Sequence, residues 1–232
     1  MRTHPVFLRL EGRRCVVIGA DAPAAAKATA CLRAGASVTV IAPELPAALE
    51  THPELRHVAR EYRRGDLGGA FLAYASTRDP AFIAELRDEA GRAGVLLNVI
   101  DVPAASTFFS PAVLERGDLA IAIGTGGASP ALSARIRREL EARVGPEYGP
   151  YVAILGAVRR VLEGEAGRAD VLAALLDAPL LDLVRRGARE DIDRVLAAYP
   201  ELTRRDVDEA LAYYQAHRRE IDAYIVRDHA ED

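Results

Sequence analysis

The sequence has few cysteines and few aromatic residues, and it has no tryptophan. Two of its 232 residues are cysteine, and aromatic residues make up 6% of the chain. Cys15 and Cys31 lack the spacing of metal ligands, and the five histidines are scattered without a histidine or cysteine grouping. We therefore expect two small core cysteines in a reducing compartment, with neither a disulfide framework nor a cysteine or histidine metal site.

The sequence also lacks a long hydrophobic run and a strong excess of one charge. No stretch approaches the roughly 20 apolar residues of a membrane span, and the first residues, Met1 to Pro5, lack the apolar core of a signal peptide. The net charge of −4 provides no basic surface for nucleic acid or an anionic membrane. We expect a soluble, cytoplasmic protein that binds neither nucleic acid nor membrane.

Strand and helix patterns alternate over the first half of the chain. Short apolar or β-branched runs predict strands, and alanine-rich or amphipathic stretches predict helices between them. The expected strands cover residues 15–19, 37–42, 55–62, 70–76 and 95–100, and the expected helices cover residues 22–34 and 80–94. This alternation predicts an α/β fold with a doubly wound, Rossmann-type parallel sheet.

The first strand ends in a turn that departs from the dinucleotide-binding fingerprint. The turn reads Gly19-Ala20-Asp21-Ala22-Pro23-Ala24, where the fingerprint is Gly-x-Gly-x-x-Gly. Gly19 and Ala24 fit, and Pro23 suits the first turn of a helix whose amino end is a natural phosphate site. Asp21 does not fit, because a carboxylate ~5 Å from one phosphate charge costs about 3 kcal/mol at an effective dielectric constant of about 20. We expect the cofactor at this turn, with weakened binding.

Two further strand ends would open onto the same crevice. Pro43 ends the second strand, and Glu44 is either the acid that binds a ribose hydroxyl pair or an exposed loop acid. Ser76 and Thr77 follow the strand that begins at Ala70. Because ligands of open α/β sheets bind outside the carboxyl ends of the strands, these four residues are candidate cofactor contacts.

The stretch LNVIDVPAASTFFSP places a carboxylate at the end of a buried strand. Residues 95–100 have the continuous apolar pattern of a strand in a parallel sheet, and Asp101 precedes the Val-Pro pair that ends it. At the carboxyl end of such a strand Asp101 would face the ligand crevice. The alternative is that Asp101 caps the following turn, as aspartate often does.

The pattern changes after Pro111. A turn at residues 116–118 is followed by an alternating strand, and the loop Gly124-Thr-Gly-Gly-Ala-Ser-Pro130 precedes a helix at residues 131–143. The amides of this loop would bind an anion, or the loop is only a flexible connection. Amphipathic spacing predicts further helices at residues 151–163, 169–176, 180–186, 190–199 and 205–224.

Several motifs in the first 145 residues recur together in one protein family. They are Pro5-Val-Phe-Leu-Arg-Leu10, Arg13-Arg-Cys-Val-Val-Ile-Gly19, Lys27 with Leu32-Arg-Ala-Gly-Ala36, Thr39-Val-Ile-Ala-Pro43, Ala73-Tyr-Ala-Ser-Thr77, Asn98-Val-Ile-Asp-Val-Pro103, Phe108, Pro111, Arg116-Gly117 and Thr125-Gly-Gly-Ala-Ser-Pro-Ala-Leu132. The chain resembles the precorrin-2 dehydrogenase and sirohydrochlorin ferrochelatase family, the non-methylating part of siroheme synthase. The Asn-Val-x-Asp and Thr-Gly-Gly-x-Ser-Pro motifs are specific, whereas residues 146–232 fit only by length and helicity.

The resemblance implies a homodimer whose subunit has three parts. These are a Rossmann-type NAD-binding domain (residues 1–111), a short dimerisation segment (112–146) and an all-helical carboxyl-terminal domain (147–232). The implied reaction is the NAD-dependent oxidation of precorrin-2 to sirohydrochlorin in siroheme biosynthesis. In some family members the insertion of ferrous iron into this tetrapyrrole follows and gives siroheme.

The resemblance also assigns roles to particular residues. Asp101 is the implied acid or base, because removal of a proton and a hydride needs a carboxylate near the nicotinamide. It is also a candidate metal ligand. The tetrapyrrole side of the site comprises Asn98, Thr125, Gly126, Gly127 and Ser129. Arg135 and Arg138 are candidates for the substrate carboxylates by charge and placement, or they belong to a solvated helix face.

The chain departs from the family pattern around its cofactor turn. The family usually has Gly-Gly-Gly where this chain has Gly19-Ala20-Asp21, and an arginine where Ala26 precedes Lys27. Two alternatives follow: a sirohydrochlorin chelatase that has lost NAD use, and a non-enzymatic tetrapyrrole-binding homologue. Asp21 separates the dehydrogenase from both alternatives, and Asp101 separates the two enzymes from the carrier.

Overall fold

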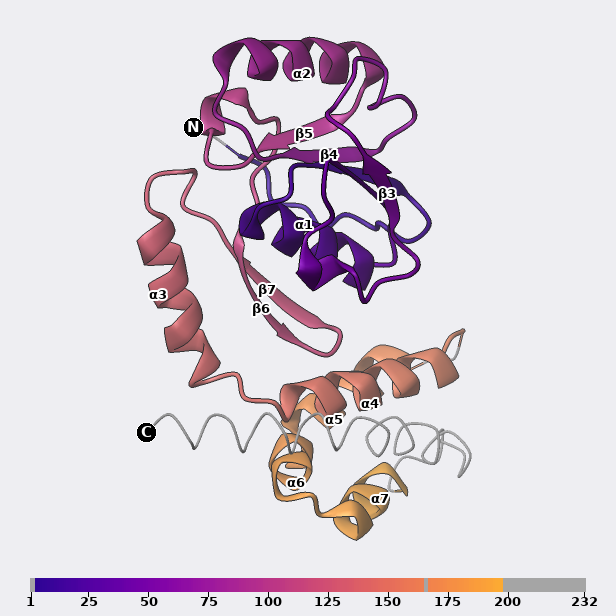
Figure 1. Ribbon diagram of the computed structural model, residues 1–232. Coiled ribbons are helices and arrows are strands. Elements are labelled where there is room, and N and C mark those ends of the chain that lie inside the picture. The colour runs from indigo at the N-terminus through magenta and orange to yellow at the C-terminus, as the bar shows by residue number, and fades with distance from the viewer. Residues whose placement is uncertain (1–2, 165–166, 198–232) are drawn as a thin grey trace. The chain divides into compact units, whose positions relative to one another are not determined.

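The computed structural model describes residues 3–164 and 167–197 (Figure 1). The internal contacts of the chain divide it into two compact units, residues 1–110 and 111–232. A further division of the second unit into a dimerisation segment and a helical domain stays a prediction. The helix expected at residues 205–224 lies outside the described residues. Within the described ranges, no helix is both long and apolar enough to cross a lipid bilayer.

The first unit contains a five-stranded, all-parallel sheet in the order β3-β2-β1-β4-β5. Its strands are β1 (Arg14–Ile18), β2 (Ser37–Ala42), β3 (Arg56–Ala59), β4 (Leu72–Ala75) and β5 (Leu96–Val99). This order confirms the predicted Rossmann-type sheet. The direction of strand addition reverses between β1 and β4, which is the switch point where such sheets bind ligands.

Helices α1 (Ala22–Arg33) and α2 (Pro80–Ala93) cover opposite faces of this sheet (Figure 1). Alternate residues of β1 point to opposite faces, so Cys15 and Val17 pack on the α1 side while Val16 and Ile18 pack on the α2 side. Both faces are therefore buried, which explains the continuous apolar runs of the strands. Cys15 and Cys31 are buried free thiols, as predicted.

The outer edge of β5 is covered by the segment that follows it. Short 3-10 helices η1 (Ala47–Leu49) and η2 (Pro103–Ala105) follow β2 and β5. After η2 the chain returns along β5, where the Thr107 N–H donates to the Leu97 carbonyl at 2.8 Å. Ser106 Oγ accepts the Val99 N–H at 3.0 Å. These bonds satisfy backbone groups of an edge strand and fix the point at which β5 ends.

The second unit begins with an antiparallel hairpin of β6 (Ala112–Arg116) and β7 (Leu119–Ile123), followed by α3 (Pro130–Glu141). The turn between the strands confirms the one predicted at residues 116–118. β6 is not predicted, because its five residues include the charged Glu115 and Arg116. Arg116 is nevertheless buried, and its Nε donates to the Val144 carbonyl at 3.0 Å.

Four helices complete the described part of the second unit. They are α4 (Tyr148–Val161), α5 (Arg168–Asp177), α6 (Leu180–Arg186) and α7 (Arg189–Ala197). Ile154, Leu175, Leu180, Ile192 and Leu196 are fully buried in their shared core. The predicted helices agree with these bounds to within a few residues.

Candidate active site

A cavity of about 290 Å³ lies at the carboxyl end of the sheet in the first unit. The N-terminus of α1 and the loops after β4 and β5 form its wall. Its lining residues are Asp21, Pro23, Ser76, Thr77, Arg78, Ile100 and Asp101. The structure therefore brings residues of the predicted cofactor segment together with the predicted acid or base. Arg78 directly follows the predicted Ser76 and Thr77 at this strand end, and Ile100 is a site residue that the sequence did not single out.

Asp101 follows the end of β5 in a left-handed backbone conformation, with φ of 60°. It is the only non-glycine residue with positive φ among the residues described. Hydrogen bonds hold the backbone on both sides, from Ile100 N–H to the Ala75 carbonyl at 2.9 Å and from Val102 N–H to the Val99 carbonyl at 3.0 Å. Aspartate tolerates this conformation better than most residues, and such strain clusters at functional sites. Asp101 thus occupies a turn and also faces the cavity.

The carboxylate of Asp101 is paired with Arg78. The Arg78 Nη2 donates to Asp101 Oδ2 at 3.1 Å, and the two side chains are 73% and 68% exposed. An ion pair as exposed as this contributes little to stability. Its effect is to orient the carboxylate at the cavity and to place one positive charge beside it.

Asp21 is the N-cap of α1. Its Oδ1 accepts the Ala24 N–H at 2.9 Å, and its Oδ2 accepts a hydrogen bond from the Ser76 hydroxyl. The carboxylate thus satisfies an N–H at the helix start, where a bound phosphate would otherwise accept it. The sequence identifies Asp21 as a departure from the fingerprint, and the structure shows which donors it binds.

Gly19 is packed between the ends of β1 and β4. Its φ is +118°, and a Cβ added to it would lie 3.1 Å from Cβ of Ser76 and 3.6 Å from Cβ of Ala24. A side chain at this position would therefore push Ser76 away from Asp21 and strain the backbone. The first glycine of the fingerprint is required here by both its conformation and its surroundings.

The other predicted residues of the first unit do not line the cavity. Asn98 is buried in β5, and its Nδ2 donates to the Phe108 carbonyl at 2.8 Å, which fixes the segment covering the strand edge. Pro43 and Glu44 are exposed beyond the end of β2. Their roles as substrate and cofactor contacts stay predictions, as do those of Ala20 and Ala22 in the turn itself.

The Thr-Gly-Gly loop of the second unit is closed by its own polar groups. Thr125 Oγ1 accepts the Ser129 N–H at 3.1 Å, and Ser129 Oγ caps α3 by accepting the Leu132 N–H at 3.2 Å. Gly126 and Gly127 both have positive φ, of 62° and 83°. The loop is therefore a defined turn, and its conformation requires the two glycines.

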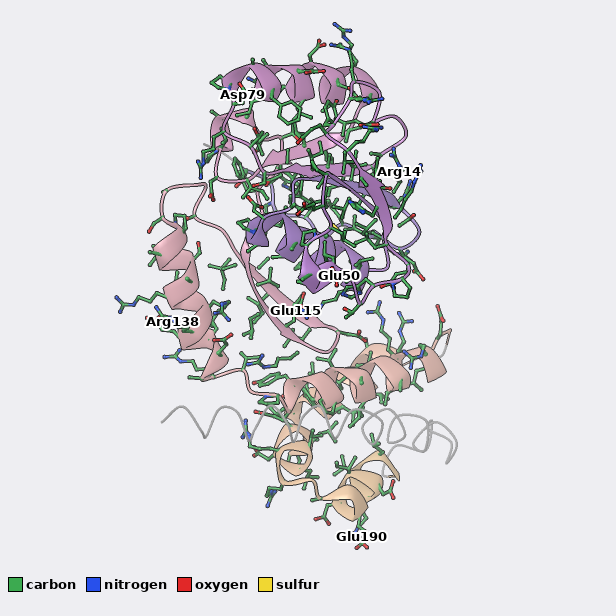
Figure 2. The ribbon with its side chains drawn as sticks, in the orientation of Figure 1. Arg14, Glu50, Asp79, Glu115, Arg138 and Glu190 are labelled. Carbon is green, nitrogen blue, oxygen red and sulfur yellow. The ribbon has the colours of Figure 1, made fainter. Side chains whose placement is uncertain are left out.

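The predicted arginines of α3 are exposed. Arg135 Nε donates to Glu139 Oε1 at 2.8 Å, an i,i+4 pair on the helix surface. Arg138 lies on the same helix and is exposed (Figure 2). The pairing of Arg135 supports the solvated-face alternative for this residue, and substrate binding by either arginine stays a prediction.

Metal binding at Asp101 finds little support in the geometry. In residues 3–164 and 167–197, no group of three or more histidine, cysteine, aspartate and glutamate side chains is arranged to hold a metal ion. The prediction that Asp101 is a metal ligand therefore rests on this one carboxylate.

Comparisons with known proteins agree with this geometry. Residues 6–112 match a family described as putative NAD(P)-binding, residues 116–143 match the central part of a sirohaem biosynthesis protein, and residues 179–214 match a protein family of unknown function. The siroheme synthases of Chromobacterium violaceum and Pseudomonas aeruginosa are 34% and 31% identical over 85% and 96% of this chain. A solved precorrin-2 dehydrogenase is 25% identical with a TM-score of 0.65, over 83% of this chain and 100% of its own.

The chain is similar to siroheme synthases in sequence and to a precorrin-2 dehydrogenase in sequence and fold. The comparisons thereby confirm the resemblance found in the sequence. The chain spans 44% and 47% of the length of the two siroheme synthases. Its first unit is the part that matches the family described as putative NAD(P)-binding, and the candidate cavity lies at the expected edge of the sheet.

The residues around Gly19 fit a dinucleotide if one side chain moves. The turn and the N-terminus of α1 provide the phosphate position of a Rossmann fold. Pro23 has no N–H, and the N–H of Ala24 is bound by Asp21. Rotation of Asp21 toward solvent would free this donor for a phosphate and remove a negative charge from its path. The turn therefore fits the phosphates of NAD once the Asp21 side chain has rotated away.

Proposed function

We propose that this protein catalyses the NAD-dependent oxidation of precorrin-2 to sirohydrochlorin in siroheme biosynthesis. The observation that carries the proposal is the position of Asp101. Its backbone is in the strained left-handed conformation, and it lines a cavity that the N-terminus of α1 also lines. The family relationship supports the reaction, and the relative with a solved structure is a precorrin-2 dehydrogenase.

The reaction removes one hydride and one proton from precorrin-2. When bound, NAD supplies the hydride acceptor. Asp101 accepts the proton, since it is a carboxylate at the cavity and Arg78 orients it through the 3.1 Å hydrogen bond. Gly19 and the N-terminus of α1 would hold the dinucleotide phosphates once Asp21 has moved, and Ser76 and Thr77, on the loop after β4, line the same cavity.

We also propose that the protein acts as a cytoplasmic homodimer. Buried free thiols at Cys15 and Cys31 suit the reducing cytoplasm. In this proposal residues 112–146 form the dimerisation segment and residues 147–232 the helical domain. Thr125 to Ser129 and the α3 arginines then bind the carboxylates of the tetrapyrrole. Light scattering after size exclusion would test the dimer.

One observation favours a second function, that of a sirohydrochlorin chelatase without NAD use. The Asp21 carboxylate binds both Ala24 N–H and the Ser76 hydroxyl, and thereby fills the position of a dinucleotide phosphate. If it stays there, the cavity and Asp101 remain available for insertion of ferrous iron, as substrate, into sirohydrochlorin.

Anaerobic turnover of precorrin-2, with and without NAD, tests the first function through the absorbance of sirohydrochlorin. NAD-dependent product is the expected result. Asp101→Asn should lower turnover about 100-fold or more, since general base catalysis contributes at least this much. Asp79→Asn is the matched control, because Asp79 caps α2 through Ala81 N–H and does not line the cavity (Figure 2). Iron insertion into supplied sirohydrochlorin, with no NAD-dependent product, would favour the chelatase.

A further inference from the structure

Lys27 is the only lysine in the chain. The chain has 30 lysines and arginines in all, and every one except Lys27 is an arginine. Lys27 lies on α1, the helix that begins at the cofactor turn, and it is half-buried. The one lysine side chain, with its compact ammonium group, is thus partly buried on a helix that begins at the candidate site. Lysine differs from arginine in having a small point charge without a planar fork.

The ammonium of Lys27 rests on an aromatic surface. Its Nζ lies 5.6 Å from the ring centroid of Tyr74, a residue of β4. Tyr74 in turn makes an edge-on contact with Phe108, with ring centroids 5.4 Å apart. A cation above an aromatic face gains a modest stabilisation. The aromatic pair therefore holds the ammonium in place without neutralising its charge.

Lys27 has no counter-ion within the described part of the chain. Ion pairs there join arginines or His52 to acidic side chains, and none includes Lys27. Burial lowers the pKa of Lys27, while the charges of Cys31 and Asp101 act in the opposite direction. A half-buried cation without a counter-ion is costly unless an anion joins it.

We propose that Lys27 is a substrate-binding residue whose ammonium binds one carboxylate of the tetrapyrrole. This inference rests on the proposed function, because the tetrapyrrole is the ligand that brings acetate and propionate groups to this site. Lys27 lies on α1, whose first turn includes the cavity residue Pro23. Its ammonium rests on Tyr74, two residues before the cavity residue Ser76. A substrate bound at this cavity would bring a carboxylate to the ammonium. Arg135 and Arg138 are exposed and Arg135 is paired with Glu139, whereas Lys27 is pre-positioned and unpaired.

The competing anion is a phosphate of NAD. Lys27 lies six positions beyond the N-cap Asp21, about 9 Å along the axis at 1.5 Å per residue. A phosphate at the helix start is thus more than one turn away from the backbone of Lys27. Because lysine side chains lean toward the N-terminus of a helix, the experiment must separate the two anions.

The single lysine makes chemical footprinting specific. In the unmodified chain the side-chain amine of Lys27 and the terminal amine are the two primary amines. We would acetylate the wild-type protein with an N-hydroxysuccinimide ester and quantify each site by peptide mass spectrometry. Sirohydrochlorin should slow acetylation of Lys27 about tenfold and leave the terminal amine unchanged, whereas NAD alone should leave both rates unchanged.

Binding titrations with variants give an independent measurement. Lys27→Met should raise the Kd for sirohydrochlorin about tenfold or more, the range for loss of a charged hydrogen bond. Its Kd for NAD should stay unchanged, and Lys27→Arg should recover part of the affinity. Arg33→Met is the control, since Arg33 is an exposed cation in the last turn of the same helix.

The outcomes separate this inference from the proposed function. If the wild-type protein binds no sirohydrochlorin, both the role of Lys27 and the proposed function are overturned. If it binds sirohydrochlorin while Lys27 acetylates at the free rate and Lys27→Met binds equally well, only the role of Lys27 is overturned. Protection by NAD alone would assign Lys27 to the cofactor and equally overturn the inference. Footprinting uses the wild-type chain, so it stands even if a variant fails to fold.

Discussion

The Ser76 hydroxyl donates a hydrogen bond to the carboxylate of Asp21, and so joins the end of β4 to the start of α1. The same carboxylate accepts the Ala24 N–H. Asp21 therefore occupies the donors that a bound phosphate would otherwise use. Binding of a dinucleotide has to break these two bonds and overcome the charge of the carboxylate. One residue thus links the stability of the α1 start to cofactor affinity.

Replacement of Asp21 should strengthen NAD binding. Asp21→Asn keeps a side chain that caps helices well but removes the charge. At about 5 Å and an effective dielectric constant of about 20 the repulsion is worth about 3 kcal/mol, so the Kd for NAD should fall about 100-fold. Isothermal titration calorimetry measures it. Asp79→Asn, at the N-cap of α2, should bind NAD like the wild type. An unchanged Kd in Asp21→Asn would mean that Asp21 does not oppose the cofactor.

The fold was predictable because the burial of each strand and helix shows in the hydrophobic pattern of a short stretch of sequence. Residues of β1 are buried on both sheet faces, which produces a continuous apolar run. α1 is predictable from its alanines, with Asp21 before it and Gly35 after it at a φ of +74°. β6 was missed, since it is short and contains Glu115 and Arg116.

The site was only partly predictable, because the sequence gives positions and not partners. Asp101 was found because it directly follows a buried strand. Asp21 and Ser76 are 55 residues apart, and their contact depends on β1 and β4 being neighbours in the sheet. The pairing of Arg78 with Asp101 depends likewise on the neighbours β4 and β5. The hydrogen bond from Asn98 to the Phe108 carbonyl was not predictable from the sequence either, and the predicted substrate contact of Asn98 stays a prediction.

Substitution of Asp101 should separate catalysis from folding. Asp101→Gly removes the carboxylate and suits the left-handed backbone, since glycine adopts a φ near 60° without strain. We expect lost turnover, as for Asp101→Asn, together with a Tm equal to or slightly above that of the wild type. Anaerobic turnover and differential scanning calorimetry measure the two properties. Wild-type turnover in Asp101→Gly would remove Asp101 from the mechanism.

Gly19→Ala should destabilise the protein more than an equivalent change elsewhere. Gly94 is the matched control, because its φ is +67° and a Cβ there would meet no atom within 4 Å. Gly94→Ala should therefore cost only the backbone strain, about 1–2 kcal/mol. Gly19→Ala adds a Cβ 3.1 Å from Ser76 Cβ, so we expect a larger loss in urea unfolding and weaker NAD binding. Equal losses in the two variants would show that Ser76 moves aside freely.

Glu89 should make the first unit sensitive to acid. Its buried carboxylate accepts hydrogen bonds from Gly65 N–H and Leu67 N–H, both at 2.9 Å, and from the Tyr62 hydroxyl. Burial by itself raises the pKa of Glu89, but these three bonds outweigh it and the pKa is lowered. The carboxylate therefore stabilises the fold fully above its ordinary pKa of 4.5, and this stabilisation is lost as the pH falls through the lower pKa of the folded state.

Glu89→Gln tests this dependence in urea unfolding. At pH 7 it should cost about 2–3 kcal/mol, because a neutral amide replaces a carboxylate that satisfies buried donors. The difference from the wild type should shrink as the pH falls below 4.5, since the wild type then loses the same charge. Glu85→Gln, one turn earlier on α2, should change the free energy of unfolding by less than about 0.5 kcal/mol. The difference in free energy of unfolding between wild type and Glu89→Gln could instead stay constant down to pH 3. That result would show that the amide destabilises the fold for steric reasons and that the charge of Glu89 does not contribute.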